Sequence, residues 1–185
     1  MGTIDAKCTE FTIVLKKTRS SKELTTPTKF PKKNPSLLCI FALQPSANMY
    51  TNLQEEELKL VIAEQFFAAY DCKPRIGKID FCVTQPRTRH NATKTETAPI
   101  VSLLWAEAKR GTVADIYKPL VQLILTIGKA RTFDTYLPPP FLAAFDAEKI
   151  AFLPYREILP FLALNDFNWN VTPSDTSSRE FGLLY

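Results

Sequence analysis

The chain has 185 residues, of which 45% are hydrophobic and 23% are charged, and its formal net charge is +4. This composition is ordinary for one globular domain that buries a sizeable core. A small positive charge is compatible with a polyanionic partner but does not require one. No apolar run is long enough to span a bilayer, so we expect no membrane partner.

Histidine and cysteine usage narrows the possible chemistry. The single histidine, His90, lies in a polar segment that reads as an exposed loop, which excludes catalytic triads and histidine-based metal sites. The cysteines lack the close spacing of zinc ligands, and we find no signal peptide. We therefore expect a cytoplasmic protein whose catalysis, if any, uses carboxylates and lysine.

Residues 1–50 form a basic N-terminal segment that we expect to pack on the core or to flank it. Residues 1–35 hold eight Lys or Arg against three acids. They could be a solvated arm or could contact phosphates, and neither interpretation is favoured. Residues 11–15 are a candidate strand, and the apolar run at 37–43 could be a strand or a buried helical turn.

The clearest predicted helix runs from Asn52 to Tyr70, with Asn52 as its cap and Glu55 in the capping-box position. Glu64 has apolar neighbours three and four positions away, at Leu60, Val61, Phe67 and Ala68. We therefore expect Glu64 to be a carboxylate within an apolar face. The alternative is that it reaches solvent at the rim of a core helix.

A predicted hairpin follows, with strands at 76–83 and 100–109 around a polar loop. Lys78 and Asp80 share a face of the first strand, and the second ends in Glu107-Ala-Lys109. Side chains alternate along a strand, so Glu107 and Lys109 point the same way. Burying such charges is costly, whereas metal-assisted hydrolysis uses them. The alternatives are an Asp80–Lys78 pair and a solvated Glu107–Lys109 pair at the sheet edge.

The next predicted helix spans Ile116–Ile127, with Asp115 as its N-cap, Pro119 in its first turn and Gly128 as its stop. It is largely apolar and should be buried against the sheet. Gln122 is the polar exception in this helix. It could equally be a hydrogen-bonded amide in the core or a functional residue.

The rest of the chain predicts a second hairpin, from strands at 141–146 and 149–153, and a short helix at 156–164. Residues 166–185 read as a polar, turn-rich tail, which could link to a further domain. We expect one domain overall, with its core at 51–165, and an α/β layered fold around one sheet.

Four acid-x-Lys patterns occur, but only Glu107/Lys109 lies at the end of an apolar strand and has acids on the preceding strand and helix. This combination resembles the PD-(D/E)xK nuclease superfamily, which implies a restriction-endonuclease-like αβββαβ core, a central mixed sheet flanked by helices. The resemblance implies that Asp80 and Glu107 bind Mg²⁺, for which Mn²⁺ can substitute, and that Lys109 is the catalytic lysine. Glu64 and Gln122 match catalytic positions on the flanking helices. Two departures are Ile79, where the family name has proline, and the long interval between Asp80 and Glu107.

The resemblance also implies a double-stranded DNA partner and an endonuclease activity. The basic residues expected along its phosphates are Arg87, Arg89, Lys94, Arg110, Lys129 and Arg131, which are otherwise solvated surface. The second hairpin looks like one found in the N-terminal domains of large restriction enzymes. This implies a restriction–modification system with a fused or associated DNA methyltransferase or translocase, and it is compatible with a homodimer.

The sequence leaves two other functions open. One is a nuclease-like module that binds nucleic acid without catalysis. The other is an interaction domain of a larger protein, whose contact would use the apolar C-terminal residues Phe181, Leu183, Leu184 and Tyr185.

Overall fold

The computed structural model describes residues 39–42, 50–72, 76–86 and 100–185. The candidate strand at 11–15, His90 and the basic segment before residue 39 lie outside these ranges. In the described residues, no helix is both long and apolar enough to cross a membrane.

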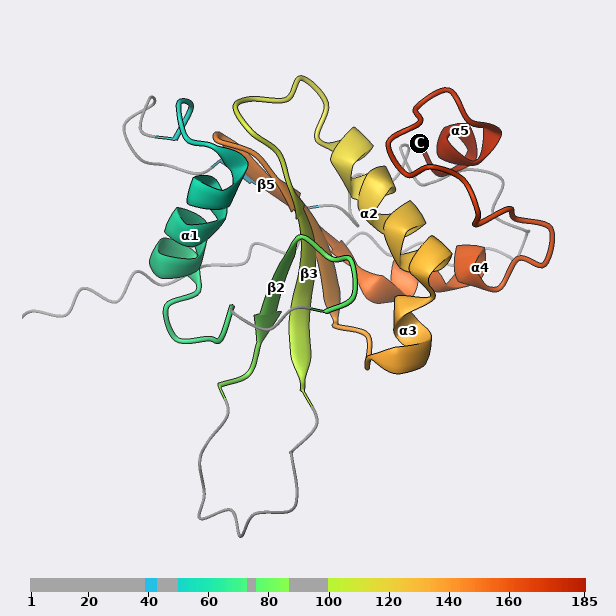
Figure 1. Ribbon diagram of the computed structural model, residues 1–185, viewed down its shortest axis with the longest axis horizontal. Helices are drawn as coiled ribbons and strands as arrows, with labels where there is room; N and C mark the ends of the chain where they lie inside the picture. Colours follow the sequence, from blue (N-terminus) through green and yellow to red (C-terminus); the bar gives the residue numbers. More distant parts are fainter. Residues whose placement is uncertain (1–38, 43–49, 73–75, 87–99) are drawn as a thin grey trace, which may run out of the picture.

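One mixed sheet lies at the centre of the molecule (Figure 1). Its strands, in the spatial order β1-β5-β4-β3-β2, are β1 (Cys39–Ala42), β5 (Lys149–Pro154), β4 (Phe141–Phe145), β3 (Ser102–Ala108) and β2 (Phe81–Thr84). The pair β3–β4 is parallel, and the other neighbours are antiparallel. Within the apolar run at 37–43, the described residues 39–42 are a strand, and the predicted second hairpin is confirmed as β4 and β5.

Helices cover both faces of the sheet, so the expected α/β layered fold is confirmed (Figure 1). The helices are α1 (Glu55–Phe66), α2 (Tyr117–Ala130), α3 (Thr132–Thr135), α4 (Leu159–Leu162) and α5 (Arg179–Leu184). The predicted helix at 156–164 is a 3-10 turn followed by α4. Between α1 and α2 the described residues contain two strands, where an αβββαβ core has three.

Helix α1 packs on one face of the sheet through Leu58 and Ile62, which are fully buried against a cluster that includes Phe81 and Phe145. This buried stripe is narrow and leaves Leu60 65% exposed. Glu64 lies on the exposed side with Leu60, so the expectation that it sits within a buried face is wrong. Of the apolar neighbours of Glu64, Val61 and Phe67 are half-buried against this cluster, whereas Leu60 and Ala68 are exposed.

The start of α1 also differs from the prediction. The N-cap is Gln54, whose backbone N–H donates to a carboxylate oxygen of Glu57 at 2.9 Å, so Asn52 and Glu55 do not form the capping box. Helix α1 is shorter at both ends than the predicted span. Its buried face packs on β2 and β3.

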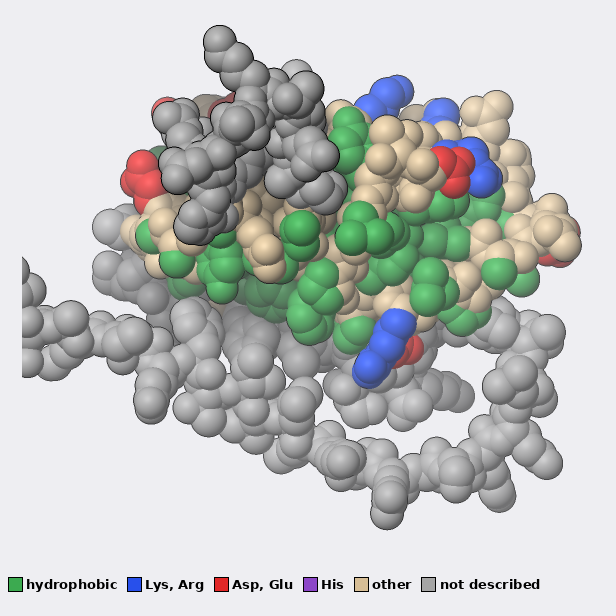
Figure 2. Space-filling view, turned by 90° about the horizontal axis from the view of Figure 1, so that it is seen from below, with side chains coloured by type: hydrophobic (Ala, Val, Ile, Leu, Met, Phe, Trp, Pro, Cys, Tyr) green, Lys and Arg blue, Asp and Glu red, His purple; other side chains and the backbone are tan. Residues whose placement is uncertain are grey.

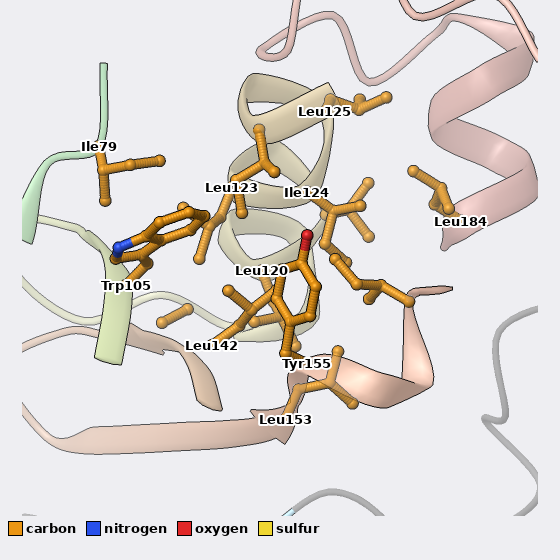
Figure 3. Packing of buried hydrophobic residues seen from close by; sticks show 14 of the residues in the cluster. Ile79, Trp105, Leu120, Leu123, Ile124, Leu125, Leu142, Leu153, Tyr155 and Leu184 are labelled. Atoms are coloured by element: carbon orange, nitrogen blue, oxygen red, sulfur yellow. The ribbon is translucent and has the colours of Figure 1, made fainter. Parts of the chain in front are cut away.

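Helix α2 packs on the opposite face and builds the larger core (Figure 3). Its Leu120, Leu123 and Ile124 contact the sheet around the fully buried Trp105. The Trp105 and Tyr155 rings meet edge to face, with centroids 6.3 Å apart. The N-cap of α2 is Ile116 rather than the expected Asp115, although Asp115 Oδ1 accepts the N–H of Tyr117 at 2.9 Å.

The C-terminal part of α2 corrects two predictions. The helix passes Gly128 and ends at Ala130, before the left-handed Arg131. Gly128 instead makes room for the Trp169 ring, which a Cβ atom at this position would meet at 1.9 Å. The segment 166–185 is not a polar tail, because Phe181 and Leu184 are buried in the α2 core. These two side chains are therefore part of the hydrophobic core and do not form a contact surface for a partner.

Candidate metal centre at the end of strands β2 and β3

The antiparallel pairing of β2 with β3 brings an acid of one strand opposite an acid of the other. Phe81 pairs with Ala106 in the register, so Asp80, just before β2, comes opposite Glu107. On its other side Glu107 pairs with Ala144 of β4. Glu107 therefore lies near the end of a central strand, between another carboxylate and a small side chain.

Asp80 enters the site from a turn rather than from a regular strand. Gly77 has a positive φ of 54°, and the N–H of Ile79 donates to the carbonyl of Ile76 at 3.0 Å. Strand β2 starts only at Phe81, so the predicted strand at 76–83 is too long at its start. Asp80 is exposed, and among the described residues no ion pair links it to Lys78.

Glu107 and Lys109 form an ion pair, as their spacing along one strand predicts. The Lys109 Nζ donates to Glu107 Oε1 at 2.7 Å. The Glu107 side chain is 13% exposed and that of Lys109 is 29% exposed. The pair is thus partly withdrawn from solvent and is not the solvated edge pair of the alternative interpretation.

The electrostatics of Glu107 are those of an under-compensated carboxylate. Burial raises its pKa to about 7; the hydrogen bond from Lys109 opposes this shift, and the negative charge of Asp80 adds to it. The effect of Asp80 on the pKa of Glu107 agrees with the strand register, which places the two acids opposite each other. A bound cation would favour the ionised form of both acids.

The donor set fits a hard divalent cation. Mg²⁺ prefers oxygen ligands, and proteins hold it through one or two carboxylates while water and substrate oxygens complete its coordination. Asp80 and Glu107 can supply these two carboxylates. Within the described part of the chain, no group of three or more His, Cys, Asp or Glu side chains is arranged to hold a metal ion. A fully protein-made metal cage is therefore not seen in these residues.

The structure does not bring the two predicted helical residues to this centre. Glu107 alternates with Ala106 and Ala108, whose side chains join the α1 core, so it points to the α2 side of the sheet. Glu64 lies on the exposed side of α1, which covers the other face. Gln122 is half-buried on α2, and no hydrogen bond between it and Glu107 is present in the described structure. The catalytic roles of Glu64 and Gln122 stay predictions without structural support.

The predicted DNA-binding residues do not form one group in the described structure. Arg110 is exposed and directly follows Lys109 in the sequence. Three others, Arg87, Arg89 and Lys94, lie outside the described residues.

Lys129 and Arg131 lie at the other end of α2, which runs antiparallel to β3 (Figure 1). A helix of this length spans about 20 Å. Both cations are engaged locally: Lys129 donates to the carbonyl of Val171 at 3.0 Å, and Arg131 pairs with Asp134 at 2.5 Å. Their positions are explained by these contacts without DNA.

The surface at that far end is more apolar than basic. Figure 2 views the molecule from below and shows hydrophobic side chains gathered over this face, with only scattered charges. Exposed large hydrophobic residues include Leu137 in the loop between α3 and β4, Phe141 at the start of β4, and Leu159 at the start of α4. A continuous basic track from Arg110 to Arg131 is not seen among the described residues.

One residue of structural interest near the centre was not identified from the sequence. Asp146, just after β4, is 0% exposed and accepts backbone N–H groups from Val113, Glu148 and Lys149. The only signal in the sequence is an acid three residues before a lysine across a tight turn, which is too common to be diagnostic.

Comparisons of the chain with protein-family models, with curated proteins and with solved structures gave no match. The resemblance to the PD-(D/E)xK superfamily thus rests on the residues of this chain and on their convergence. The structure is that of an α/β protein in which Asp80, Glu107 and Lys109 lie together at the end of two antiparallel strands.

Proposed function

We propose that this chain is an Mg²⁺-dependent endonuclease domain that hydrolyses phosphodiester bonds in DNA. The observation that carries the proposal is the convergence of Asp80, Glu107 and Lys109 at one end of the sheet, after an interval of more than twenty residues in the sequence. Two adjacent carboxylates and an ammonium group are the residue types that metal-assisted phosphodiester hydrolysis uses.

Each residue has a distinct role in this proposal. Asp80 and Glu107 hold the cation, which when bound neutralises charge on the phosphate and lowers the pKa of a coordinated water. Lys109 stands beside Glu107 and presents its ammonium group where negative charge grows in the transition state. Glu107 must be ionised to bind metal, and the neighbouring Lys109 favours that ionised form.

Charged groups around the centre support DNA as the substrate in this proposal. Arg110 is exposed next to Lys109 and can contact a neighbouring phosphate, while the net charge of +4 favours a polyanion. Membership of a restriction–modification system, with a DNA methyltransferase or translocase as partner, is the part of the proposal that rests on the family resemblance alone.

Nicking of supercoiled plasmid in the presence of Mn²⁺ tests the activity. The wild-type chain is compared with Glu107→Ala, with Lys109→Met, and with Glu148→Gln, which alters an exposed acid on the β4–β5 turn. We expect nicking by the wild type and by Glu148→Gln, and its loss in the other two variants and in EDTA. Metal-dependent nicking that persists in Glu107→Ala would contradict the proposed centre.

Salt-dependent DNA binding measured on the same proteins separates the competing functions. Wild-type protein that binds duplex DNA at low salt, loses affinity steeply as salt rises and never nicks it would be a non-catalytic binding module. Protein that binds no DNA at any salt concentration would favour an interaction domain instead.

A further inference from the structure

Asp146 is a fully buried acid to which the proposed reaction gives no role. Its Oδ1 accepts the backbone N–H groups of Glu148 and Lys149 at 2.8 and 2.9 Å, and the Lys149 Nζ lies 3.6 Å from its Oδ2. A buried charge is tolerated only when it is paired and hydrogen-bonded, and charge-assisted hydrogen bonds of this kind fix geometry strongly. The β4–β5 turn is therefore a rigid support.

Two further contacts reach from this turn to residues 110–113, which follow β3. The Oδ2 of Asp146 accepts the N–H of Val113 at 2.9 Å, and the Lys149 Nζ donates to the carbonyl of Val113 at 2.6 Å. The hairpin turn itself needs neither contact, because Val113 is 33 residues away from Asp146 in the sequence. Asp146 and Lys149 together form a clamp on both peptide groups of Val113.

Backbone hydrogen bonds place Lys109 inside the clamped region. The Lys109 N–H donates to the carbonyl of Phe145, and the Ala147 N–H donates to the carbonyl of Gly111, both at 2.9 Å. These bonds continue the β3–β4 pairing beyond the last strand residue, where a free strand end would open easily. Gly111 has a φ of 64°, which allows the chain to turn away immediately afterwards.

We propose that Asp146 is a positioning residue for Lys109. By holding Val113 it fixes the backbone on the C-terminal side of Lys109, and so sets where the ammonium group stands relative to Glu107. The hold on the backbone follows from the contacts above, and its catalytic consequence rests on the proposed nuclease function. Misplacing a catalytic group by about 1 Å can cost on the order of a hundredfold in rate.

The kinetic test compares Asp146→Asn and Lys149→Met with Glu148→Gln in the full chain. Asp146→Asn keeps the shape of the side chain and removes its charge, and Lys149→Met removes the donor to Val113. We expect kcat for plasmid nicking to fall roughly 10- to 100-fold in both, with KM changed less than about 3-fold, and Glu148→Gln to match the wild type. Urea denaturation identifies conditions under which each variant is folded. Unchanged kcat in folded Asp146→Asn would overturn the proposal.

Amide hydrogen exchange tests the clamp independently of activity. In Asp146→Asn we expect at least about tenfold faster exchange at Lys109, Val113 and Ala147, while Trp105 in the middle of β3 keeps its rate. If the wild type does not nick DNA, this localised change still supports the clamp, and only the nuclease proposal fails. Unchanged exchange at Lys109 and Val113 would overturn the clamp whatever the activity.

Discussion

The ends of β3 and β4 lie side by side, and each carries an acid followed by a lysine, yet the two acids have opposite surroundings. Asp146 is completely buried, accepts three backbone N–H groups and pairs with Lys149. Among the described side chains, Glu107 pairs with Lys109 alone and faces the negative charge of Asp80. The first acid is fully compensated by the protein, whereas the second is compensated only in part.

This difference indicates what each acid does. A buried charge that has all of its hydrogen-bond and ion-pair partners stabilises one geometry, because removing any partner leaves a buried polar or charged group unpaired. An under-compensated carboxylate with a raised pKa is instead suited to bind a ligand that supplies the missing positive charge. Chemical type and spacing are nearly the same at the two positions, so only the three-dimensional surroundings distinguish the structural acid from the functional one.

The largest effect on stability is expected from Asp146→Ala. The change leaves three backbone N–H groups without their acceptor and the Lys149 ammonium without its counter-charge, so we expect a loss of about 3–5 kcal/mol in the free energy of unfolding. Glu107→Ala should cost less than about 1 kcal/mol at pH 8, because it removes an acid that burial destabilises in its charged form. Urea denaturation of both variants measures the difference, and equal losses would refute the contrast between the two acids.

A second large effect should come from the scaffold that lies against the sheet. Gly128→Ala places a methyl group on the Trp169 ring, so we expect about 1–3 kcal/mol of destabilisation despite the better helix propensity of alanine. Gly182→Ala is the matched control, because nothing lies within 4 Å of its added methyl group, and it should be neutral or stabilising. If thermal melting gives both variants the same sign, the packing of residues 166–185 on α2 is not as described.

The pH dependence of stability sharpens the comparison at Glu107. Its pKa in the folded protein, about 7, lies above its ordinary value of 4.5, so the folded state binds the extra proton between these two pH values. Stability from this group is thus present in acid and is lost as pH rises toward and past 7. We expect Glu107→Gln to gain about 1–3 kcal/mol relative to the wild type between pH 5 and pH 8 in the absence of metal. A constant difference across this range would contradict the burial of Glu107.

The smallest effect should come from an acid–base pair in solvent. Arg131 and Asp134 form an ion pair at 2.5 Å, but their side chains are 65% and 48% exposed. Asp134→Ala should therefore change the free energy of unfolding by no more than about 0.5 kcal/mol, and less in high salt. A larger loss would mean that the solvent exposure of an ion pair does not predict how much the pair contributes to the stability of this protein.

Local patterns were enough to predict the part of the site that depends on adjacent strands. The period of two placed Glu107 and Lys109 on one side, and the predicted hairpin paired the strands of Asp80 and Glu107, whose convergence was expected from the family resemblance. The pairing of β4 with β5 followed from two apolar runs with a tight turn between them. In each case the information lies within one strand or one hairpin.

The errors arose where contacts between distant segments decide the outcome. The apolar neighbours of Glu64 suggested a buried face around it, but the face of α1 that the sheet buries is centred on Leu58 and Ile62 and leaves Glu64 exposed. Gly128 looked like a helix stop because the ring of Trp169, which requires a glycine there, is far away in the sequence. The role of Asp146 depends on Val113 in the same way. A single sequence carries no local signal for such contacts.

Titration with Mn²⁺, followed by electron paramagnetic resonance of the free ion, tests the central claim most directly. The account predicts that the wild type binds one ion at a site containing Asp80 and Glu107. It also predicts that Asp80→Asn and Glu107→Gln each weaken this binding by at least about tenfold. Glu148→Gln, which alters an exposed acid elsewhere, should bind as the wild type does. Equal Mn²⁺ affinity in the wild type and in Glu107→Gln would contradict the assignment of this strand end as a metal centre.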